Sequence, residues 1–546
     1  MALYRSNQKN ILLVYPEFPN KTYWGMQYSL PFIGRKAFLP PLGLITIAAM
    51  SPPKHQFRLV DLNCRELSDD DLGWADMVCF SAMLPQQTPL FRAASRCKAA
   101  GKPVVFGGPF PTACPEVCRS HCDVLVLNEG ELTWPAFLED FEQGTWRDVY
   151  THQKRPDLRE TPIPRFDLLN MNDYGMIPVQ FSRGCPFRCE FCDITVLFGR
   201  KQRTKTSSQF IAELQVLYDM GYRGGILVVD DNFIGNKRAV LNLLSDLQAW
   251  NETHRHPFLF FTQASLDLAD DRILLKRMVD ADFKGVFLGI ESPSRESLKE
   301  AGKFQNIKDS LVDSVKTIQQ AGLVVHGGFI IGFDHDGEDI FDRLIAFVTE
   351  AAIPNAFVEL LFALPGTALH KRLEREGRLE PIDTENYLES RTNIVTILPR
   401  RKLLEGFRKV IETIYAPSEY FKRTLEHFSR LPPPDTRVAR VRNLLRVGEK
   451  VIRIFSVNER QERASNLSLV GRLRTLRHFF RQLPWEFRKE SLRFLWHFVR
   501  ICPDRLPGAL FFIIMGMHLY RYSFGDLIPD LDKGLEPIRR EQKKKA

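Results

Sequence analysis

Short apolar runs recur along the first part of the chain and alternate with stretches of helical spacing. Runs of three to six residues, typical of buried strands, occupy 11–15, 57–62, 77–82, 104–106 and 124–127. Thr88–Ala100 and Thr133–Glu142 have the periodicity of helices. Strands that alternate with helices at this spacing indicate parallel βαβ units. The pattern predicts a doubly wound α/β domain over residues 1–150.

The alternation resumes after residues 151–172, a segment rich in proline and charge that we interpret as a linker. Six further strands are predicted, at 178–182, 225–229, 258–263, 286–289, 325–331 and 357–361. Helices are expected between them, among others at 208–220, 238–251 and 309–321. A closed barrel of this kind needs eight units. Six units predict a partial (βα)6 barrel over residues 173–386.

The strand signals fade in residues 387–546, where basic helical stretches with aromatic residues take over. These stretches include Arg437–Arg446, Gly471–Phe480 and the series Trp485, Phe487, Phe494, Trp496 and Phe498. Such amphipathic helices usually pack against a neighbouring domain. Contact with an anionic lipid surface is the alternative, because basic amphipathic helices bind membranes. The apolar run Leu510–Met515 and the basic tail Lys543–Lys545 favour that alternative.

Composition narrows the class of protein. The chain has 44% hydrophobic residues and a formal charge of +9, so it can build sizeable cores and is mildly basic. We find no nucleic-acid-binding module and expect no nucleic acid partner. The early apolar run Ile11–Val14 is too short for a signal peptide, and no run approaches the roughly 20 apolar residues of a spanning helix. We therefore expect a cytoplasmic protein whose ten cysteines are thiols or metal ligands.

Three cysteines, Cys185, Cys189 and Cys192, form a C-x3-C-x2-C array directly after the first predicted barrel strand. Barrel enzymes place their chemistry at the carboxyl ends of the strands. Three thiolates can hold three irons of a cubane cluster and leave the fourth iron open to a chelating ligand. Two alternatives remain at this point, namely three buried cysteines without metal and a zinc site with a distant fourth ligand.

This array resembles the cysteine loop of the radical S-adenosylmethionine (SAM) superfamily, with Phe191 as the aromatic residue before the last cysteine. The resemblance covers about residues 175–375 and implies a four-iron four-sulfur (4Fe–4S) cluster that cleaves SAM to a 5′-deoxyadenosyl radical. It implies SAM contacts from a set of residues on the loop and at strand ends, namely Phe191, Asp193, Gly224, Gly225, Asp230, Glu291 and Gly332.

The first domain resembles the cobalamin-binding domain of one branch of that superfamily. The resemblance implies cobalamin contacts from Asp61, Asn63, Ser81, Gly107 and Gly108, all at predicted strand ends, where open α/β sheets bind ligands. The usual Asp-x-His-x-x-Gly motif has Asn63 at its histidine position and Glu66 at its glycine position. Any cobalamin would then be base-off and His-off. A degenerate domain that keeps the fold without the cofactor is the alternative.

A second cysteine series, Cys114, Cys118 and Cys122, would line one face of a helix. A second metal cluster is conceivable, but Pro115 interrupts the series. We predict that these cysteines pack against the sheet as small apolar side chains.

The resemblance implies a cobalamin-dependent radical SAM enzyme that methylates an unactivated carbon, as in the hopanoid methylase branch with a long helical extension. It also implies a flavodoxin- or ferredoxin-type electron donor and a small substrate that is apolar or lipid-like. If the C-terminal helices bind lipid, peripheral membrane contact is expected as well. Two other hypotheses remain: a radical cyclase or oxidative rearrangement with the same cofactors, and a non-catalytic cluster-binding regulator.

Overall fold

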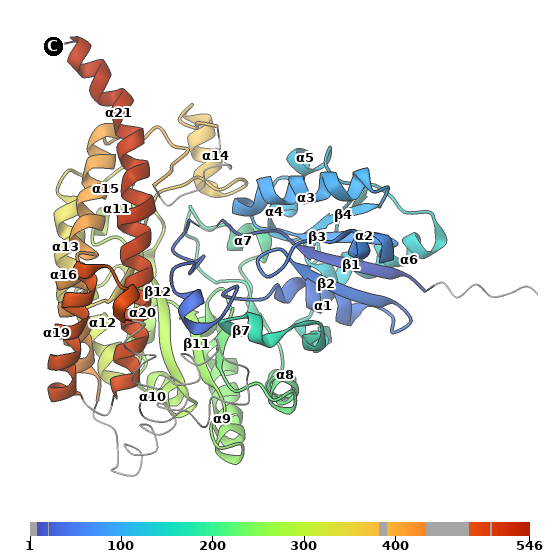
Figure 1. Cartoon of the computed structure of the whole chain (residues 1–546), viewed down its shortest axis with the longest axis horizontal. Helices are drawn as coiled ribbons and strands as arrows, with labels where there is room; N and C mark the ends of the chain where they lie inside the picture. Colours follow the sequence, from blue (N-terminus) through green and yellow to red (C-terminus); the bar gives the residue numbers. More distant parts are fainter. Residues whose placement is uncertain (1–7, 20, 382–389, 433–479, 503–504, 546) are drawn as a thin grey trace, which may run out of the picture.

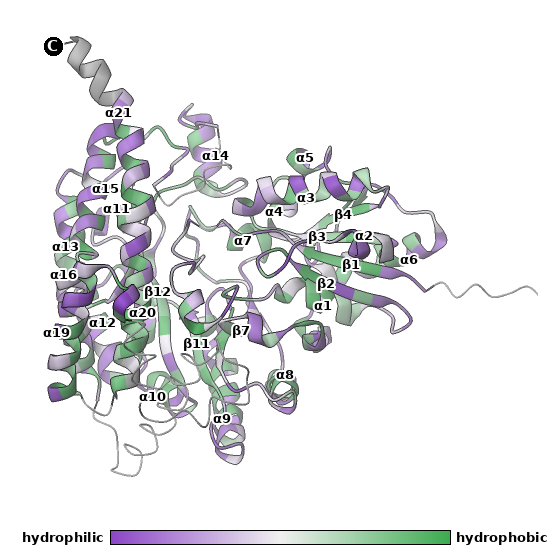
Figure 2. Cartoon of the chain, in the orientation of Figure 1, coloured by the Kyte–Doolittle hydropathy of each residue, from purple (hydrophilic) through white to green (hydrophobic). Residues whose placement is uncertain are grey.

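A computed structural model describes residues 8–19, 21–381, 390–432, 480–502 and 505–545 of the chain. Two parallel sheets of six strands each form its frame (Figure 1). The first sheet lies at one end of the molecule, the second lies in the middle, and the C-terminal helices stand along the far side of the second sheet. Apolar residues concentrate on the strands and on the helix faces that cover them (Figure 2).

The first sheet has the strand order β2-β1-β3-β4-β5-β6. Its strands are β1 (Asn10–Tyr15), β2 (Gln56–Asp61), β3 (Met77–Ser81), β4 (Val104–Gly107), β5 (Val124–Val126) and β6 (Val149–Tyr150). Alternate side chains point to opposite faces of a strand, and two separate cores follow from this. Leu12 and Val14 pack with α2 (Asp69–Trp74) and α3 (Gln87–Ala99). Ile11 and Leu13 pack with α1 (Leu42–Met50) and α6 (Gly130–Gln143) on the other face.

Helices on both faces of a parallel sheet make this domain doubly wound, as predicted. The second cysteine series lies in the core with Leu12 and Val14. Cys118 is fully buried and Cys114 and Cys122 are nearly so. They lie on or beside two short helices, α4 (Pro109–Ala113) and α5 (Pro115–Cys118), because Pro115 starts a new helix. The prediction that these cysteines pack as apolar side chains is confirmed.

The second sheet has the order β14-β13-β12-β11-β10-β7, with every neighbouring pair parallel. Its strands are β7 (Met176–Val179), β10 (Gly225–Val228), β11 (Leu259–Ala264), β12 (Phe283–Glu291), β13 (Val324–Ile331) and β14 (Asn355–Leu360). Helices on the outer side include α8 (Ser207–Asp219), α9 (Lys237–Thr253), α10 (Arg272–Asp280), α12 (Leu311–Ala321) and α13 (Ile340–Glu350). This is the predicted partial (βα)6 barrel.

The C-terminal region is helical, as predicted. It consists of α15 (Arg400–Ile414), α16 (Pro417–Arg430), α19 (Trp485–Ile501), α20 (Leu506–Tyr522), a π-helical turn at Ser523–Leu527 and α21 (Ile528–Lys545). Most of its buried apolar side chains belong to one hydrophobic cluster with those of the barrel. Tyr415 and Tyr420 bond to Ala356 and Asn355 of β14, so α15 and α16 cover the edge of the barrel sheet.

One expectation for this region is corrected. Residues 512–515 of the apolar run Leu510–Met515 are buried inside the protein, so that run fills the core and does not favour lipid contact. Arg437–Arg446 and most of Gly471–Phe480 lie outside the described residues, and the side chains of Lys543–Lys545 are not described. No helix within the described ranges is both long enough and apolar enough to cross a bilayer.

The segment predicted as a linker is packed along much of its length. It contains three short 3-10 helices, at Leu158–Glu160, Phe166–Leu168 and Met171–Asp173. Leu158 and Phe166 are almost fully buried, and Phe166 belongs to the barrel core. The proline and charged residues therefore correctly indicated a connection between the two domains. The apolar side chains in the same segment pack against the protein and order it.

Candidate functional site

The three-cysteine loop begins at the carboxyl end of β7, the first barrel strand. It is enclosed by a two-stranded antiparallel hairpin, β8 (Ser182–Arg183) and β9 (Arg203–Thr204). Gly184 has φ +92°, and a Cβ there would lie 2.9 Å from the carbonyl oxygen of Gly199. Only glycine meets both conditions without strain. The Gly184 amide donates to Asp231 Oδ2 at 2.7 Å, which ties the loop to the end of β10.

Cys185, Cys189 and Cys192 are half-buried, and burial raises the pKa of each thiol. Cys189 interacts electrostatically with both of the other cysteines. Among the described residues, no group of three or more histidine, cysteine or acidic side chains is arranged around one metal position. This holds for the three cysteines of the loop as well. The donor set itself, three thiols on one short loop, fits an iron–sulfur cluster.

A buried ion pair, Glu291–Lys303, lies beside the cysteines. Lys303 Nζ donates to Glu291 Oε1 at 2.6 Å, and both side chains are about nine-tenths buried. The carboxylate of Glu291 and the nearby thiols of Cys189 and Cys192 together raise the pKa of Lys303 although its burial opposes this. Glu291 itself has φ +67°, an uncommon conformation for a residue with a side chain. Sequence reasoning found Glu291 but missed Lys303, because no motif marks it.

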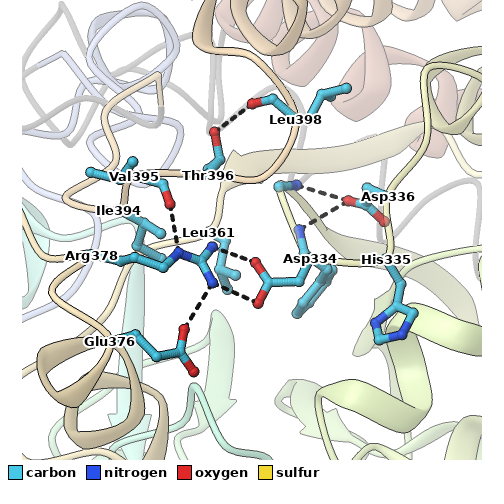
Figure 3. Close-up of polar contacts among 12 residues, drawn as sticks. Asp334, His335, Asp336, Leu361, Glu376, Arg378, Ile394, Val395, Thr396 and Leu398 are labelled. Atoms are coloured by element: carbon cyan, nitrogen blue, oxygen red, sulfur yellow. Dashed lines mark hydrogen bonds and ion pairs between the residues drawn. The ribbon is translucent and has the colours of Figure 1, made fainter.

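A second ion-pair network anchors the far side of the loop. Glu190 accepts from Arg372 Nη2 at 2.8 Å, and its own amide and carbonyl bond to Ala301 and Leu369. Arg372 also donates to Asp334 at 3.0 Å. Asp334 in turn accepts from Arg378 (Figure 3). The network holds the cysteine loop to the segments that follow β12, β13 and β14.

Gly332, predicted at the SAM site, lies at the carboxyl end of β13 with φ +112°. Its amide and that of Phe333 donate to Asp336 Oδ2 at 2.8 and 3.1 Å (Figure 3). The Phe333 ring meets Phe191 edge-on, with 6.2 Å between centroids. The aromatic residue of the cysteine loop is therefore packed against the β13 turn. Asp193 precedes α7 (Ile194–Leu197), and burial raises the pKa of its carboxyl.

Two predicted SAM contacts lie at the other end of the sheet, and a third is buried beneath the loop. Gly224 and Gly225 lie at the amino end of β10, where Gly225 pairs with Met176 at the start of β7. Because the two strands are parallel, this is the opposite end of the sheet from the cysteine loop. Asp230 is at the correct end but fully buried, and it accepts hydrogen bonds from Phe181 N at 2.8 Å and Ser182 Oγ at 2.5 Å. Asp230 therefore braces the base of the loop.

The strand ends of the first domain hold the residues predicted for cobalamin. Asn63 accepts from the Phe18 amide at 2.7 Å and donates to Pro16 O and to Asp61 Oδ1. Asp61 is buried and also accepts from Tyr174 Oη at 3.1 Å, and burial raises its pKa. The Asn63 amide is thus occupied within the protein.

Ser81, Gly107 and Gly108 lie together at the ends of β3 and β4. Gly108 has φ +90°, and a Cβ there would lie 2.3 Å from Ser81 Oγ. A Cβ at Gly107 would lie 3.0 Å from the carbonyl oxygen of Val126. The local backbone therefore favours glycine at both positions, most strongly at Gly108.

The two sets of strand ends are joined by ion pairs that sequence reasoning missed. Glu129, which follows β5, accepts from Arg183 Nη1 at 3.0 Å and from Arg203 Nη1 at 2.8 Å. Arg183 also binds Glu131. All four side chains are largely buried. Next to them α4, which starts after Gly108, contacts α7, which starts after Asp193. The carboxyl end of the first sheet and the cysteine loop therefore meet.

Comparison with known proteins gives the same picture. The Radical SAM superfamily model matches residues 179–348, and the family described as Domain of unknown function (DUF4070) matches 367–524. An uncharacterized methyltransferase of Synechocystis sp. is 45% identical over 78% of this chain and 80% of its own length. The hopanoid C-2 methylase of Rhodopseudomonas palustris is 34% identical over 76% and 78%.

Two solved structures share the fold. The cobalamin-dependent SAM radical enzyme OxsB, with aqua-cobalamin and SAM bound, has a TM-score of 0.59 at 15% identity and covers 97% of this chain and 81% of its own. The radical SAM methyltransferase TsrM from Kitasatospora setae has a TM-score of 0.53 at 13% identity over 68% and 75%.

The fold is thus an α/β domain joined to a partial barrel with a three-cysteine loop, the frame of a radical SAM enzyme. The chain belongs to the radical SAM superfamily, in the family that includes the hopanoid C-2 methylase. The predicted family and fold class are confirmed. As in that superfamily generally, a 4Fe–4S cluster and SAM are the cofactors.

Proposed function

We propose that this enzyme transfers a methyl group to an unactivated carbon with the help of cobalamin bound to its first domain. Cys185, Cys189 and Cys192 hold the cluster in this proposal. When bound, the cluster supplies the electron that cleaves SAM, and cobalamin carries the methyl group. A flavodoxin- or ferredoxin-type protein is the proposed electron donor.

The observation that carries the proposal is the meeting of the two strand-end regions. A cofactor over Ser81 and Gly108 and a cluster on the cysteine loop would face each other across the α4–α7 contact. The Glu129–Arg183 pair, 3.0 Å long and largely buried, joins the segment after β5 to the hairpin that encloses the cysteine loop and so aligns the two regions. Such rigidity suits chemistry in which two cofactors act in turn on one substrate atom.

The residues of this chain have definite tasks in the proposal. Lys303 places a positive charge beside Cys189 and Cys192 and offsets the negative charge of thiolate ligands. Glu291 accepts from Lys303 and offers its other acceptor sites to a donor on SAM. At the first domain, the Asn63 side chain is occupied within the protein and Ser81 offers a hydroxyl to the cofactor. This supports a base-off, His-off cobalamin.

The names of the relatives support methylation over the other hypotheses. Both relatives are named as methylating enzymes, and the chain matches most of their length. A cyclase would give a product of unchanged carbon number, whereas methylation adds one carbon. A cluster-binding regulator would keep its iron but form no 5′-deoxyadenosine.

The test is anaerobic purification with iron and corrinoid quantified together, followed by incubation with SAM and dithionite. We expect a full cluster, about one corrinoid per chain and formation of 5′-deoxyadenosine. Cys189→Ala should abolish the cluster absorbance and SAM cleavage. Cys502→Ala is the matched control, since Cys502 is also half-buried but lies in the helical region. Unchanged cleavage in Cys189→Ala, or corrinoid-free enzyme of full activity, would contradict the proposal.

We also propose that α19 touches an anionic membrane surface. Its side chains Trp485, Leu492, Trp496 and Val499 are 69%, 51%, 54% and 49% exposed, and at 100° per residue they form one stripe. Basic residues flank the stripe, namely Arg488, Lys489, Arg493 and Arg500, and the Arg500 guanidinium lies 3.2 Å from the Trp496 ring centroid. An apolar stripe with tryptophans and basic flanks is the pattern of an interfacial helix.

Sedimentation with vesicles tests this contact. The full-length protein should bind vesicles rich in phosphatidylglycerol and bind pure phosphatidylcholine weakly. Removal of both exposed indoles in Trp485→Ala/Trp496→Ala should weaken binding by roughly tenfold or more. Trp146→Ala is the control, because Trp146 is exposed on the first domain. Equal binding of the double variant would refute the membrane contact.

A further inference from the structure

A short turn after α11 (Arg295–Glu300) meets the cysteine loop. It comprises residues 302–306, and we call it the lysine turn. Gly302 has φ +67°, and a Cβ there would lie 2.8 Å from the carbonyl oxygen of Arg188, so the backbones of the turn and the loop are in contact. Asn306 donates to two carbonyl oxygens near the end of β12, at 2.9 and 3.0 Å. The lysine turn is therefore held between the cysteine loop and the carboxyl end of β12.

Two side chains of the lysine turn face the cysteines. Gln305 Nε2 donates to Cys189 Sγ, with 3.9 Å between the two atoms. Lys303, in its ion pair with Glu291, lies close enough to interact electrostatically with each of the three thiols of the loop. Phe304 lies between these two residues in the sequence and is 66% exposed. The turn thus directs one positive charge and one hydrogen-bond donor toward the cysteines.

The other two cysteine sulfurs also accept hydrogen bonds from N–H groups. The side chain of Asn232 and the backbone amide of Phe187 donate to Cys185. The backbone amide of Ile194 donates to Cys192. Together with the bond from the lysine turn, each of the three sulfurs has at least one N–H donor. Hydrogen bonds to a charged form favour that form, so these surroundings suit thiolate sulfurs.

The Glu291–Lys303 pair is oriented toward the cysteines by its positive end. Lys303 interacts with all three thiols, and its effect on Cys189 exceeds the opposing effect of Glu291. A second carboxylate, Asp193, acts on Cys192. The charge that all three sulfurs share is therefore that of the lysine.

Stability alone does not account for a charged pair at this place. Both side chains are about nine-tenths buried. Replacing a buried ion pair by apolar residues of similar volume is often neutral or even stabilising. The orientation of the pair toward the three sulfurs gives it a task that an apolar pair could not perform.

We propose that Lys303 and Gln305 set the reduction potential of the iron–sulfur cluster and raise it toward the range of a protein electron donor. This inference rests on the proposed function, because it takes the three cysteines as the cluster ligands. Reduction moves one electron from the donor to the cluster, and no bond forms or breaks and no proton moves. The reduced cluster is the more negative form, so a nearby positive charge and N–H bonds to the sulfurs both stabilise it.

A redox titration of the anaerobic, cluster-loaded enzyme without SAM tests the inference, with the EPR signal of the reduced cluster followed against the applied potential. Lys303→Met should lower the ratio of reduced to oxidised cluster at a given potential about tenfold, a shift of about 59 mV to more negative potential. Gln305→Leu should lower that ratio about threefold. Glu291→Gln removes the opposing negative charge, so its potential should shift upward.

The double variant Glu291→Gln/Lys303→Met guards against misfolding of Lys303→Met, because it removes both members of the buried pair. The pair has no net charge, but its positive end acts more strongly on the sulfurs. The potential of the double variant should therefore lie between those of the wild type and of Lys303→Met. This order is expected from electrostatics, whereas a structural role would change iron content or stability and leave the potential of the loaded cluster unchanged.

Matched controls are Lys308→Met, whose amine pairs with Asp270 at 2.7 Å, and Gln248→Leu, whose amide donates to Glu252 on the surface of α9. Both should titrate close to the wild type. If the double variant and Gln305→Leu hold a full cluster and titrate at the wild-type potential, the inference is overturned. The proposed function is judged separately, by the loss of the cluster in Cys189→Ala.

Discussion

The two parallel sheets of this protein place polar residues at their carboxyl ends in opposite ways. In the first sheet, Asp61 and Asn63 form hydrogen bonds with each other and with Tyr174, Pro16 and Phe18. In the barrel, Glu291 and Lys303 form a buried ion pair beside half-buried thiols. A buried ion pair is costly unless both partners stay in place. The barrel end therefore depends on a charged pair, whereas Asp61 and Asn63 of the first sheet are held by a network of hydrogen bonds.

The largest expected effect tests the charged end of this comparison. Lys303→Met leaves the Glu291 carboxylate buried without its partner and should lower the free energy of unfolding by about 3–5 kcal/mol. The double variant Glu291→Gln/Lys303→Met should recover most of that loss in thermal unfolding experiments. Lys308→Met is the control, since its partner Asp270 is 62% exposed and the pair is worth less than about 1 kcal/mol. A double variant as unstable as the single one would contradict the account.

The pH dependence of stability tests a second buried charge of the barrel, Asp230. Burial raises its pKa from 3.8 to about 7, so the folded state favours the protonated carboxyl. The contribution of Asp230 to stability should therefore be fully present below about pH 4 and be lost as pH rises through about 7, by at most about 4 kcal/mol. Asp230→Asn does not titrate and should flatten this part of the pH profile of thermal unfolding. Asp231 titrates in both proteins, so the difference between the profiles isolates Asp230.

The control for this profile is Asp313→Asn, whose side chain is 73% exposed. Its profile should overlay that of the wild type. Equal slopes for Asp230→Asn and the wild type between pH 4 and 7 would mean that Asp230 is ionised in the folded state throughout.

A smaller effect is expected in the first sheet, where strain is in the backbone. Gly108→Ala forces a Cβ into φ +90° and to 2.3 Å from Ser81 Oγ, and should cost about 2–3 kcal/mol. Ser81→Ala/Gly108→Ala removes the close contact but not the dihedral penalty, so it should recover part of the loss in chemical denaturation. Full recovery would show that the left-handed conformation of residue 108 costs little.

The same contrast explains what could be predicted from the sequence. Apolar runs located almost every strand, because parallel strands covered by helices on their outer faces must be continuously apolar or nearly so. The cysteine loop followed from spacing after a strand. The short strand Val149–Tyr150 was missed because two residues carry no period. Gly224 and Gly225 were misplaced because a glycine pair beside a strand does not reveal which end of the sheet it serves.

Other residues of the site could not be found in the sequence because their partners are far away along the chain. Glu129 and Arg183 are ordinary charged residues until the two domains meet, and Gln305 meets Cys189 only in the folded barrel. For α19, spacing predicted an amphipathic helix, but it could not tell that Phe487, Phe494 and Phe498 face the core while Trp485 and Trp496 face outward. Tertiary contacts alone decide these assignments.

The smallest expected effect concerns the missing histidine at position 63. In Asn63→His, the imidazole would enter a site in which the native amide bonds to Phe18 N, Pro16 O and Asp61. It can replace at most part of these bonds, so unfolding stability should fall by about 1–2 kcal/mol. Because the side chain at this position points toward its hydrogen-bond partners within the protein, bound corrinoid should keep the absorption spectrum of the base-off, His-off form. A spectral shift to the His-ligated form would mean that only the residue type, and not the local structure, keeps cobalt unligated here.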